Sequence, residues 1–309
     1  MKGITSFCLT LCLSTPLLAT AAEPDSCKLV RFGDIGWADI AVTNAVTRFL
    51  LSSLGYTTQA TQRTSQETYA ALKDNTLDVF LGNWVPAGSQ PSPDGSRSET
   101  LRANLLGAKY TLAVPDYVYD AGLHSFADIA KYSTELNGEI QGIHPGSGNK
   151  RIAKMIAENT FGLGKFKLIE SNEKHMLANV GRAMHLKQWR VFLGWEPHPM
   201  NTRMKLRYLE GGDDIFGPEY GSSTVYTNTR VGYAKECSNV GQLLQNLEFS
   251  LEMENVLMDA VQNQQETPRR AAKAWLKTHP QVLDAWLAGV KTRDGQPGLD
   301  AVKASLGLQ

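Results

Sequence analysis

Four aromatic residues stand at or near the ends of predicted strands, where an α/β sheet opens toward a ligand crevice. They are Trp37, Trp84, Tyr110 and Trp195. Taken singly, a tryptophan at such a place is most often a packing residue of the core. Rings from several loops that meet in one cleft instead form a box whose negative π faces surround a cation. Together, the four positions predict a cage for a quaternary ammonium group, which has no N–H to hydrogen-bond.

Asp39 lies two residues beyond Trp37 and can supply a formal negative charge beside that cage. A carboxylate at this place also begins a predicted helix, where it interacts favourably with the helix dipole. The two roles are compatible, and both stay open here. A box of rings also selects against lysine-like ammonium groups, because their N–H donors would lose hydration without finding acceptors.

The first part of the chain alternates between strand and helix patterns. We expect strands at Cys27–Ile35, Thr57–Thr61 and Leu77–Leu81, and helices at Trp37–Leu54 and Gln66–Leu72. This order predicts a parallel sheet with helices on both faces. The segment from Val85 to Glu99 is rich in Pro, Ser and Gly and carries no period, which predicts a surface loop.

The same alternation returns in the middle of the chain. The expected strands are Tyr110–Val114, Glu139–Ile143, Phe166–Glu170 and Arg190–Gly194, and the expected helices are Ser125–Tyr132, Lys150–Phe161 and Glu173–Leu186. A short segment at Leu206–Leu209, a glycine-rich stretch at Gly211–Gly217 and a β-branched run at Ser223–Val231 follow. Two amphipathic helical runs, Val240–Gln262 and Arg269–Leu287, end the chain.

These segments predict two α/β lobes. Residues 23–110 would form the first part of lobe I, residues 111–212 lobe II, and residues 213–309 the return segment and C-terminal helices of lobe I. Two crossings between the lobes make a double hinge. A clamshell of this kind holds its ligand in the cleft between the lobes.

The N-terminal residues predict secretion. Lys2 is followed by an apolar stretch from Ile4 to Leu18 and by the small residues of positions 19–22. This pattern is typical of a signal peptide over residues 1–22, cleaved near Ala21 or Ala22. No later segment approaches the roughly 20 apolar residues that a membrane span requires. We therefore expect a freely diffusing protein of the periplasm.

Composition excludes recognition by bulk charge. Lys plus Arg and Asp plus Glu each number 31, so the chain has no net field to hold nucleic acid or an acidic membrane. A charged ligand must be recognised locally. We expect no nucleic-acid partner and a monomeric protein.

Only two cysteines remain once the leader, with Cys8 and Cys12, is removed. In an oxidising compartment Cys27 and Cys237 suggest one disulfide, and the alternative is two free buried thiols. If the two pair, the return segment must lie against the first strand, because bridged Cα atoms are at most about 7 Å apart. Lobe I would then be discontinuous, with lobe II inserted into it.

Several stretches spread over the mature chain resemble one known family in combination. They are FGDIGWADI from Phe32, DVFLGNW from Asp78, GAKYTLA from Gly107, VFLGWEPHPMN from Val191, GGDDIFGPEYG from Gly211 and QLLQNLEFSLEMEN from Gln242. The chain resembles the choline-binding periplasmic proteins of ABC importers. That family lies within a broader quaternary-amine group with receptors for glycine betaine and carnitine.

The resemblance implies a fold, a ligand and partners. The fold would be the two-lobed periplasmic binding protein fold (type II-like), closing about its hinge on the ligand, with a Cys27–Cys237 bridge. The ligand would be choline or a related quaternary amine, delivered to the membrane permease of an ABC importer without any cofactor. Trp37, Trp84, Tyr110 and Trp195 would form the aromatic box, and Asp39 would face the ammonium.

One turn departs from the family pattern. Family members place an Asn directly after the glycine of the Gly142–Gly146 turn, where it binds the choline hydroxyl, whereas this chain continues with Ser147, Gly148 and Asn149. Ser147 or Asn149 could make that contact from the start of the following helix. Ser147 could equally be only the N-cap of that helix.

Other classes of protein have less support in the sequence. A periplasmic enzyme acting on a small amine would need a catalytic or metal constellation, but His144 and His198 stand in separate turns without metal-ligand spacing. Asp213 and Asp214 fit a turn. An adhesive module would present its aromatics as a flat patch. Glycine betaine and carnitine remain alternative ligands, although their carboxylate would want an Arg, and none stands in the aromatic motifs.

Overall fold

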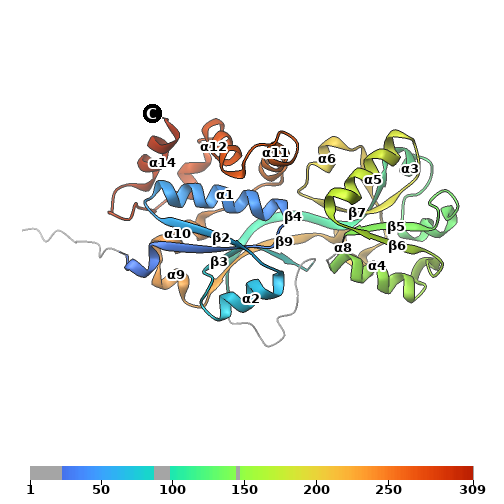
Figure 1. Cartoon of the computed structure of the whole chain (residues 1–309), viewed down its shortest axis with the longest axis horizontal. Helices are drawn as coiled ribbons and strands as arrows, with labels where there is room; N and C mark the ends of the chain where they lie inside the picture. The colour runs from blue at the N-terminus through green and yellow to red at the C-terminus, as the bar shows by residue number, and fades with distance from the viewer. Residues whose placement is uncertain (1–22, 87–97, 144–146, 309) are drawn as a thin grey trace, which may run out of the picture.

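The computed structural model describes residues 23–86, 98–143 and 147–308. Two lobes lie side by side along the long axis of the molecule (Figure 1). The predicted two-lobed α/β class is therefore confirmed. The predicted leader, residues 1–22, lies outside the described residues, as do residues 87–97 of the expected surface loop and His144. The lobe boundaries given above stay a prediction.

Within the described ranges, nine strands form one sheet in the order β2-β1-β3-β9-β4-β7-β5-β6, with β8 paired to β4. The strands are β1 (Leu29–Asp34), β2 (Thr57–Gln62), β3 (Val79–Val85), β4 (Ser98–Pro115), β5 (Glu139–Ile143), β6 (Lys167–Ser171), β7 (Val191–Glu196), β8 (Leu206–Tyr208) and β9 (Ser223–Arg230). We call the lobe around β1, β2 and β3 the first lobe and the lobe around β5, β6 and β7 the second lobe.

The sheet is parallel at its two ends and antiparallel at its centre. β1 pairs in parallel with β2 and β3, and β5 pairs in parallel with β6 and β7. β9 runs antiparallel to β3 and β4, and β4 runs antiparallel to β7. The predicted parallel sheet is thus confirmed within each lobe, while antiparallel strands join the lobes.

Strand β4 is much longer than predicted, because it begins at Ser98 rather than at Tyr110. Its first part pairs with β9 of the first lobe, and its last part pairs with β7 of the second lobe. Register shifts interrupt the pairing with β9 between Thr100 and Arg102, and twice more before Ala108. Such bulges break the two-residue alternation of apolar and polar side chains that reveals a strand in a sequence.

Helices cover the sheet in both lobes. The α-helices are α1 (Ala38–Ser53), α2 (Ser65–Lys73), α3 (Asp116–Asp120), α4 (Ser147–Ala157), α5 (Glu173–His185), α6 (Met200–Arg203), α7 (Asp213–Phe216), α8 (Pro218–Gly221), α9 (Tyr233–Glu236), α10 (Ser238–Asn246), α11 (Leu251–Gln262), α12 (Pro268–Thr278), α13 (Val282–Trp286) and α14 (Gly298–Leu306). Short 3-10 helices stand at η1 (Asp25–Cys27), η2 (Phe126–Tyr132) and η3 (Thr160–Gly162). α1 is packed between the sheet and the C-terminal helices α11, α12 and α14 (Figure 1).

Three predicted helices differ in detail. The run from Val240 to Gln262 is two helices, because the chain extends between α10 and α11, where the N–H of Phe249 bonds to the carbonyl of Asn104. The run predicted from Arg269 to Leu287 is interrupted after α12, which ends at Thr278, because Pro280 disfavours a helical backbone at the residue before it. The segment at Ser125–Tyr132 forms the 3-10 helix η2 instead of an α-helix. Asp213 and Asp214 begin the one-turn helix α7.

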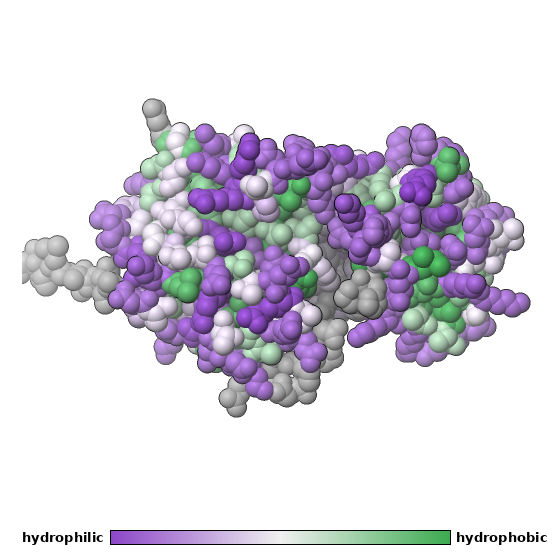
Figure 2. All heavy atoms as spheres, viewed as in Figure 1, coloured by the Kyte–Doolittle hydropathy of each residue, from purple (hydrophilic) through white to green (hydrophobic). Residues whose placement is uncertain are grey.

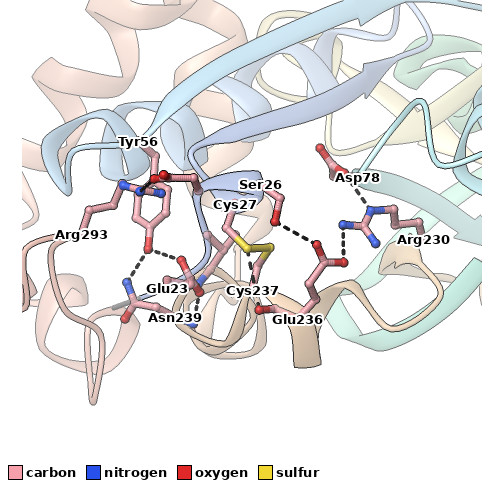
Figure 3. Close-up of a disulfide and its surroundings, with 12 residues drawn as sticks. Glu23, Ser26, Cys27, Tyr56, Asp78, Arg230, Glu236, Cys237, Asn239 and Arg293 are labelled. Carbon is pink, nitrogen blue, oxygen red and sulfur yellow. Dashed lines mark hydrogen bonds and ion pairs between the residues drawn. A yellow bond between two sulfur atoms is a disulfide. The ribbon is translucent and has the colours of Figure 1, made fainter. Parts of the chain in front are cut away.

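A disulfide joins Cys27 to Cys237, with the two Cα atoms 5.5 Å apart. This confirms the predicted bridge and rules out the alternative of two free thiols. Figure 3 shows polar groups around it: Arg230 pairs with both Asp78 and Glu236. The bridge ties the start of β1 to the start of α10, so segments 210 residues apart are held in the same lobe.

Within the described part of the chain, no helix combines the length and the apolar character needed to cross a bilayer.

Candidate ligand-binding site

One cavity of about 880 Å³ is lined by residues of both lobes. In the space-filling view the surface is hollowed between the lobes (Figure 2). The first lobe lines the cavity with the ends of β1, β2 and β3 and with the starts of α1 and α2, and the second lobe does so with β5, β7, α4 and α5. Five of the seven predicted ligand-binding residues line it: Trp37, Asp39, Trp84, Tyr110 and Trp195.

Trp37 is placed by the turn that connects β1 to α1. β1 ends at Asp34, whose carboxylate accepts a hydrogen bond from the N–H of Gly36 at 2.7 Å. Gly36 has φ +82°, a conformation that favours glycine. Trp37 then takes an extended backbone at the N-cap of α1. Its ring meets that of Trp84 edge-on, with the centroids 6.1 Å apart.

Trp84 is almost fully buried at the end of β3, with 2% of its surface exposed. Its indole Nε1–H donates to Oδ2 of Asp39 at 2.9 Å. Two residues earlier, a Cβ added at Gly82 would lie 2.2 Å from Cδ1 of Ile40. Glycine at this position lets α1 approach β3 closely enough to bring Asp39 to the indole.

Asp39 is a buried carboxylate in the first turn of α1. Burial raises its pKa to about 6, the nearby charge of Glu173 adds to that rise, and the hydrogen bond from Trp84 opposes it. Burial, helped by the charge of Asp39, also raises the pKa of Glu254 well above its ordinary value. A cation in the cavity would favour the charged form of Asp39, because an opposite charge stabilises a buried carboxylate.

Tyr110 and Trp195 are direct partners across the antiparallel pair of β4 and β7. Directly opposite residues of such a pair point to the same face of the sheet, which places both rings at the cavity. The Tyr110 hydroxyl accepts a hydrogen bond from the N–H of Gly148 at 3.3 Å. The Trp195 ring lies 4.9 Å from the ring of His198.

The remaining two predicted contacts fall at the start of α4. The structure begins α4 at Ser147, whose side chain lies outside the described part of the chain. Asn149 is 3% exposed and donates from Nδ2 to Oε1 of Glu170 on β6 at 2.8 Å. It is not one of the residues that line the cavity. The structure therefore does not bring Asn149 to the other site residues, and its contact with a ligand stays a prediction.

Three charged residues line the cavity without having been singled out from the sequence: Arg63, Lys150 and Glu173. Arg63 directly follows β2, and its Nε is buried with no hydrogen-bond partner among the described residues. The rule that places Trp37 at the end of β1 would have placed Arg63 too, because parallel strands end at the same edge of a sheet. The absence of Arg from the aromatic motifs therefore does not mean that the cavity lacks an Arg.

The described residues offer little that would hold a metal ion. The one group with suitable geometry among them is Cys27, Glu236 and Cys237, and its two sulfur atoms are already bonded to each other. His198 is buried, and its Nδ1 accepts from the N–H of Met200 at 3.0 Å. The rings and carboxylates that line the cavity are groups that can hold a cation.

Fold and site together define a two-lobed solute-binding protein. The family described as the substrate-binding domain of ABC-type glycine betaine transport systems matches residues 28–278. The chain belongs to this family, which is one of receptors for ABC importers.

The solved structures include close neighbours. An ABC-transporter choline-binding protein in complex with choline has 51% sequence identity and a TM-score of 0.85, and the match covers 92% of this chain and 100% of that one. The lactococcal glycine betaine-binding protein OpuAC, closed on glycine betaine, has 25% identity and a TM-score of 0.74, with 84% and 99% covered.

The curated proteins give shorter matches. An uncharacterized protein, ORF1, of Chromohalobacter salexigens is 40% identical over 154 residues, which are 48% of this chain and 99% of ORF1. The glycine betaine/carnitine transport binding protein GbuC of Listeria monocytogenes is 29% identical over 164 residues, covering 52% of this chain and 53% of GbuC.

Proposed function

We propose that this protein is a periplasmic receptor that binds choline through its trimethylammonium group and delivers it to the permease of an ABC importer. The observation that carries the proposal is the convergence of Trp37, Trp84, Tyr110 and Trp195 on one cavity that also contains Asp39. Methylated ammonium groups are the cations that such a set of rings recognises best. The 51% identity to a choline-binding protein supports the same ligand.

Each site residue has a defined role in this proposal. The four rings surround the methyl groups, and Asp39 supplies the countercharge while its hydrogen bond fixes the indole of Trp84. The contact with the choline hydroxyl stays assigned to Ser147 or Asn149, both at the start of α4. The ligand meets the rings of one lobe first, and closure of the other lobe then excludes water, which strengthens each cation–π contact.

This role requires no chemical step. The receptor would act as a monomer in the periplasm after removal of residues 1–22, and would release its ligand unchanged. Lobe I would be discontinuous, as the sequence predicts, with residues 23–110 and 213–309 in it, and residues 111–212 would form the inserted lobe II. The antiparallel strands β4 and β9 fit the two crossings of a double hinge, because β4 pairs with β9 of the first lobe and then with β7 of the second lobe.

Glycine betaine is the second candidate ligand. Arg63 and Lys150 line the cavity, one from each lobe, and either can pair with the carboxylate of this zwitterion. The matched family is named for glycine betaine transport. Choline is favoured because the carboxylate of Asp39 lies against Trp84 of the aromatic box, and because the choline-binding neighbour is 51% identical while the glycine betaine-binding one is 25% identical.

Calorimetric titration of the mature protein with choline, glycine betaine and carnitine tests the proposal. We expect choline to bind most tightly, and the ligand to be recovered unchanged after incubation. A thermal shift with choline should accompany binding, since a ligand stabilises the native state by RT ln(1 + [L]/Kd). Absence of binding by all three ligands at millimolar concentration would refute the proposed function. Tighter binding of glycine betaine than of choline would mean that glycine betaine, and not choline, is the ligand.

A further inference from the structure

Glu173 is a carboxylate of the second lobe that lines the cavity. It begins α5 directly after the N-cap Asn172, whose side chain accepts from the N–H of His175 at 2.9 Å. The Glu173 side chain is 30% exposed, so it is partly desolvated but not buried in the core. One of its oxygens, Oε1, receives two separate side-chain contacts, and these contacts come from different lobes.

The first contact ties Glu173 to the aromatic box. Nδ1 of His198 accepts a hydrogen bond from the N–H of Met200, so the ring proton belongs on Nε2. Nε2 lies 3.2 Å from Oε1 of Glu173 and can donate to it. The same imidazole lies against the ring of Trp195. The carboxylate and this box residue are therefore positioned by one buried histidine.

The second contact comes from the first lobe. Nε2 of Gln262, at the end of α11, donates to Oε1 of Glu173 at 2.9 Å. α11 packs on α1, and in Figure 1 it is the helix of the first lobe next to α5 and α6. Three residues before Gln262, Asp259 forms an ion pair with Arg203 of α6. The first lobe thus holds Glu173 only while α11 faces the second lobe.

The negative charge of Glu173 also acts on Asp39, the other carboxylate discussed at this site. Its charge contributes to raising the pKa of Asp39, so two carboxylates act on the same cavity from opposite lobes. The cationic side chains that line this cavity are Arg63 and Lys150, and neither forms an ion pair with a described residue. A monovalent organic cation between Asp39 and Glu173 would relieve their mutual repulsion.

We propose that Glu173 is a second countercharge that makes the site selective for net cations, and that its alignment by Gln262 links this selectivity to lobe closure. This inference rests on the proposed function of a quaternary-amine receptor. Glycine betaine carries a carboxylate as well as the ammonium group, so the field of Glu173 attracts one end and repels the other. Choline has only the attracted end.

The variant Glu173→Gln tests the charge, because the amide keeps the size of the side chain and an oxygen that can accept from His198. By titration calorimetry we expect choline to bind roughly tenfold more weakly, and glycine betaine to change by less than about threefold. Glu173→Asp, which keeps the charge, should retain the preference for choline. Glu158→Gln is the matched control, since it removes an exposed carboxylate of the same lobe.

The variant Gln262→Ala tests the alignment without changing any residue of the cavity. It should weaken choline binding roughly threefold, mainly through faster dissociation, and should add little to Glu173→Gln in the double variant. Gln242→Ala is the control, because among the described residues the Gln242 side chain bonds only to Asn246 of its own helix, α10. Slower dissociation than in the native protein, or full additivity in the double variant, would overturn the link to closure.

The two failures can be told apart. If the native protein binds choline but Glu173→Gln weakens choline and glycine betaine equally, or weakens neither, Glu173 is not a countercharge while the receptor function stands. If the native protein binds no quaternary amine, the proposed function itself fails.

Discussion

The two halves of the aromatic box are built in different ways. Trp37, Asp39 and Trp84 form what we call the tryptophan half-site, in which one hydrogen bond and one edge-on ring contact join the three side chains. Tyr110 and Trp195 form the strand-pair half-site, where two rings stand side by side on the ladder between β4 and β7. The first half-site is held by its own members, whereas the second relies on its neighbours Gly148 and His198.

The two half-sites should therefore contribute differently to the stability of the fold and to the affinity for the ligand. Trp84 and Asp39 are buried against α1 and β3, so they contribute to the core of the first lobe as well as to the cavity. Trp195 is only partly buried and packs at the edge of the core. A change in the tryptophan half-site should therefore cost both folding and affinity, while a change at Trp195 should cost mostly affinity.

The largest effect is expected for Trp84→Ala. Removal of a buried tryptophan costs about 3–5 kcal/mol in the free energy of unfolding, and it also leaves the buried carboxylate of Asp39 without its indole donor. Choline binding should fall below detection. Urea denaturation and calorimetry measure the two losses.

A conservative variant checks the cause of that loss. Trp84→Phe keeps a ring but lacks the N–H, so it should recover part of the stability and leave the pKa of Asp39 higher than in the native protein. The idea of a self-supporting half-site is wrong if Trp84→Ala unfolds at the same urea concentration as the native protein.

Trp195→Ala should weaken choline binding by roughly tenfold or more. The melting temperature of the unliganded protein should remain nearly unchanged, because the ring is partly exposed at the cavity. Trp189→Ala is a suitable control, since Trp189 packs on Tyr132 and does not line the cavity. Unfolding of the unliganded Trp195→Ala protein would show that the strand-pair half-site is part of the core.

Sequence patterns were sufficient for the tryptophan half-site and for most of the elements that place it. The glycines near Trp37 and Trp84, Gly36 in a turn and Gly82 within β3, are local features, and local features are visible in a sequence. The first part of β4 was missed because its bulges break the alternation of side chains. Arg63 follows β2 directly, so the strand-end rule could have found it, whereas Glu173 lies at the cavity only because the second lobe brings α5 there, which no local pattern reveals.

Acidity should act on the tryptophan half-site through Asp39, whose pKa is about 6. Below that pH the carboxyl group is protonated and the countercharge is lost. Choline affinity should therefore rise as the pH increases from about 5 to 7, by up to about tenfold. Titration calorimetry at several pH values measures the rise, and Asp39→Asn should flatten it, except for a remainder from Glu254, whose pKa burial also raises.

The stability of the unliganded protein should respond in the opposite direction. A carboxyl group whose pKa is raised in the folded state binds more protons when folded than when unfolded, between its ordinary pKa near 3.8 and about 6. The free energy of unfolding then falls as the pH rises through this window. An affinity and a stability that both increase with pH would show that another group controls the response.

The smallest effect is expected where the lobes meet outside the cavity. Arg203 and Asp259 pair at the surface between α6 and α11, and exposed ion pairs contribute little, because water and salt screen them. Asp259→Asn should therefore weaken choline binding about twofold to threefold, and less at high salt, because ions screen exposed charges. Since the pair joins the lobes and lies outside both half-sites, its loss should leave the urea midpoint of the unliganded protein nearly unchanged. A tenfold loss of affinity would mean that closure depends more on this surface pair than on the ligand's own contacts with the two half-sites.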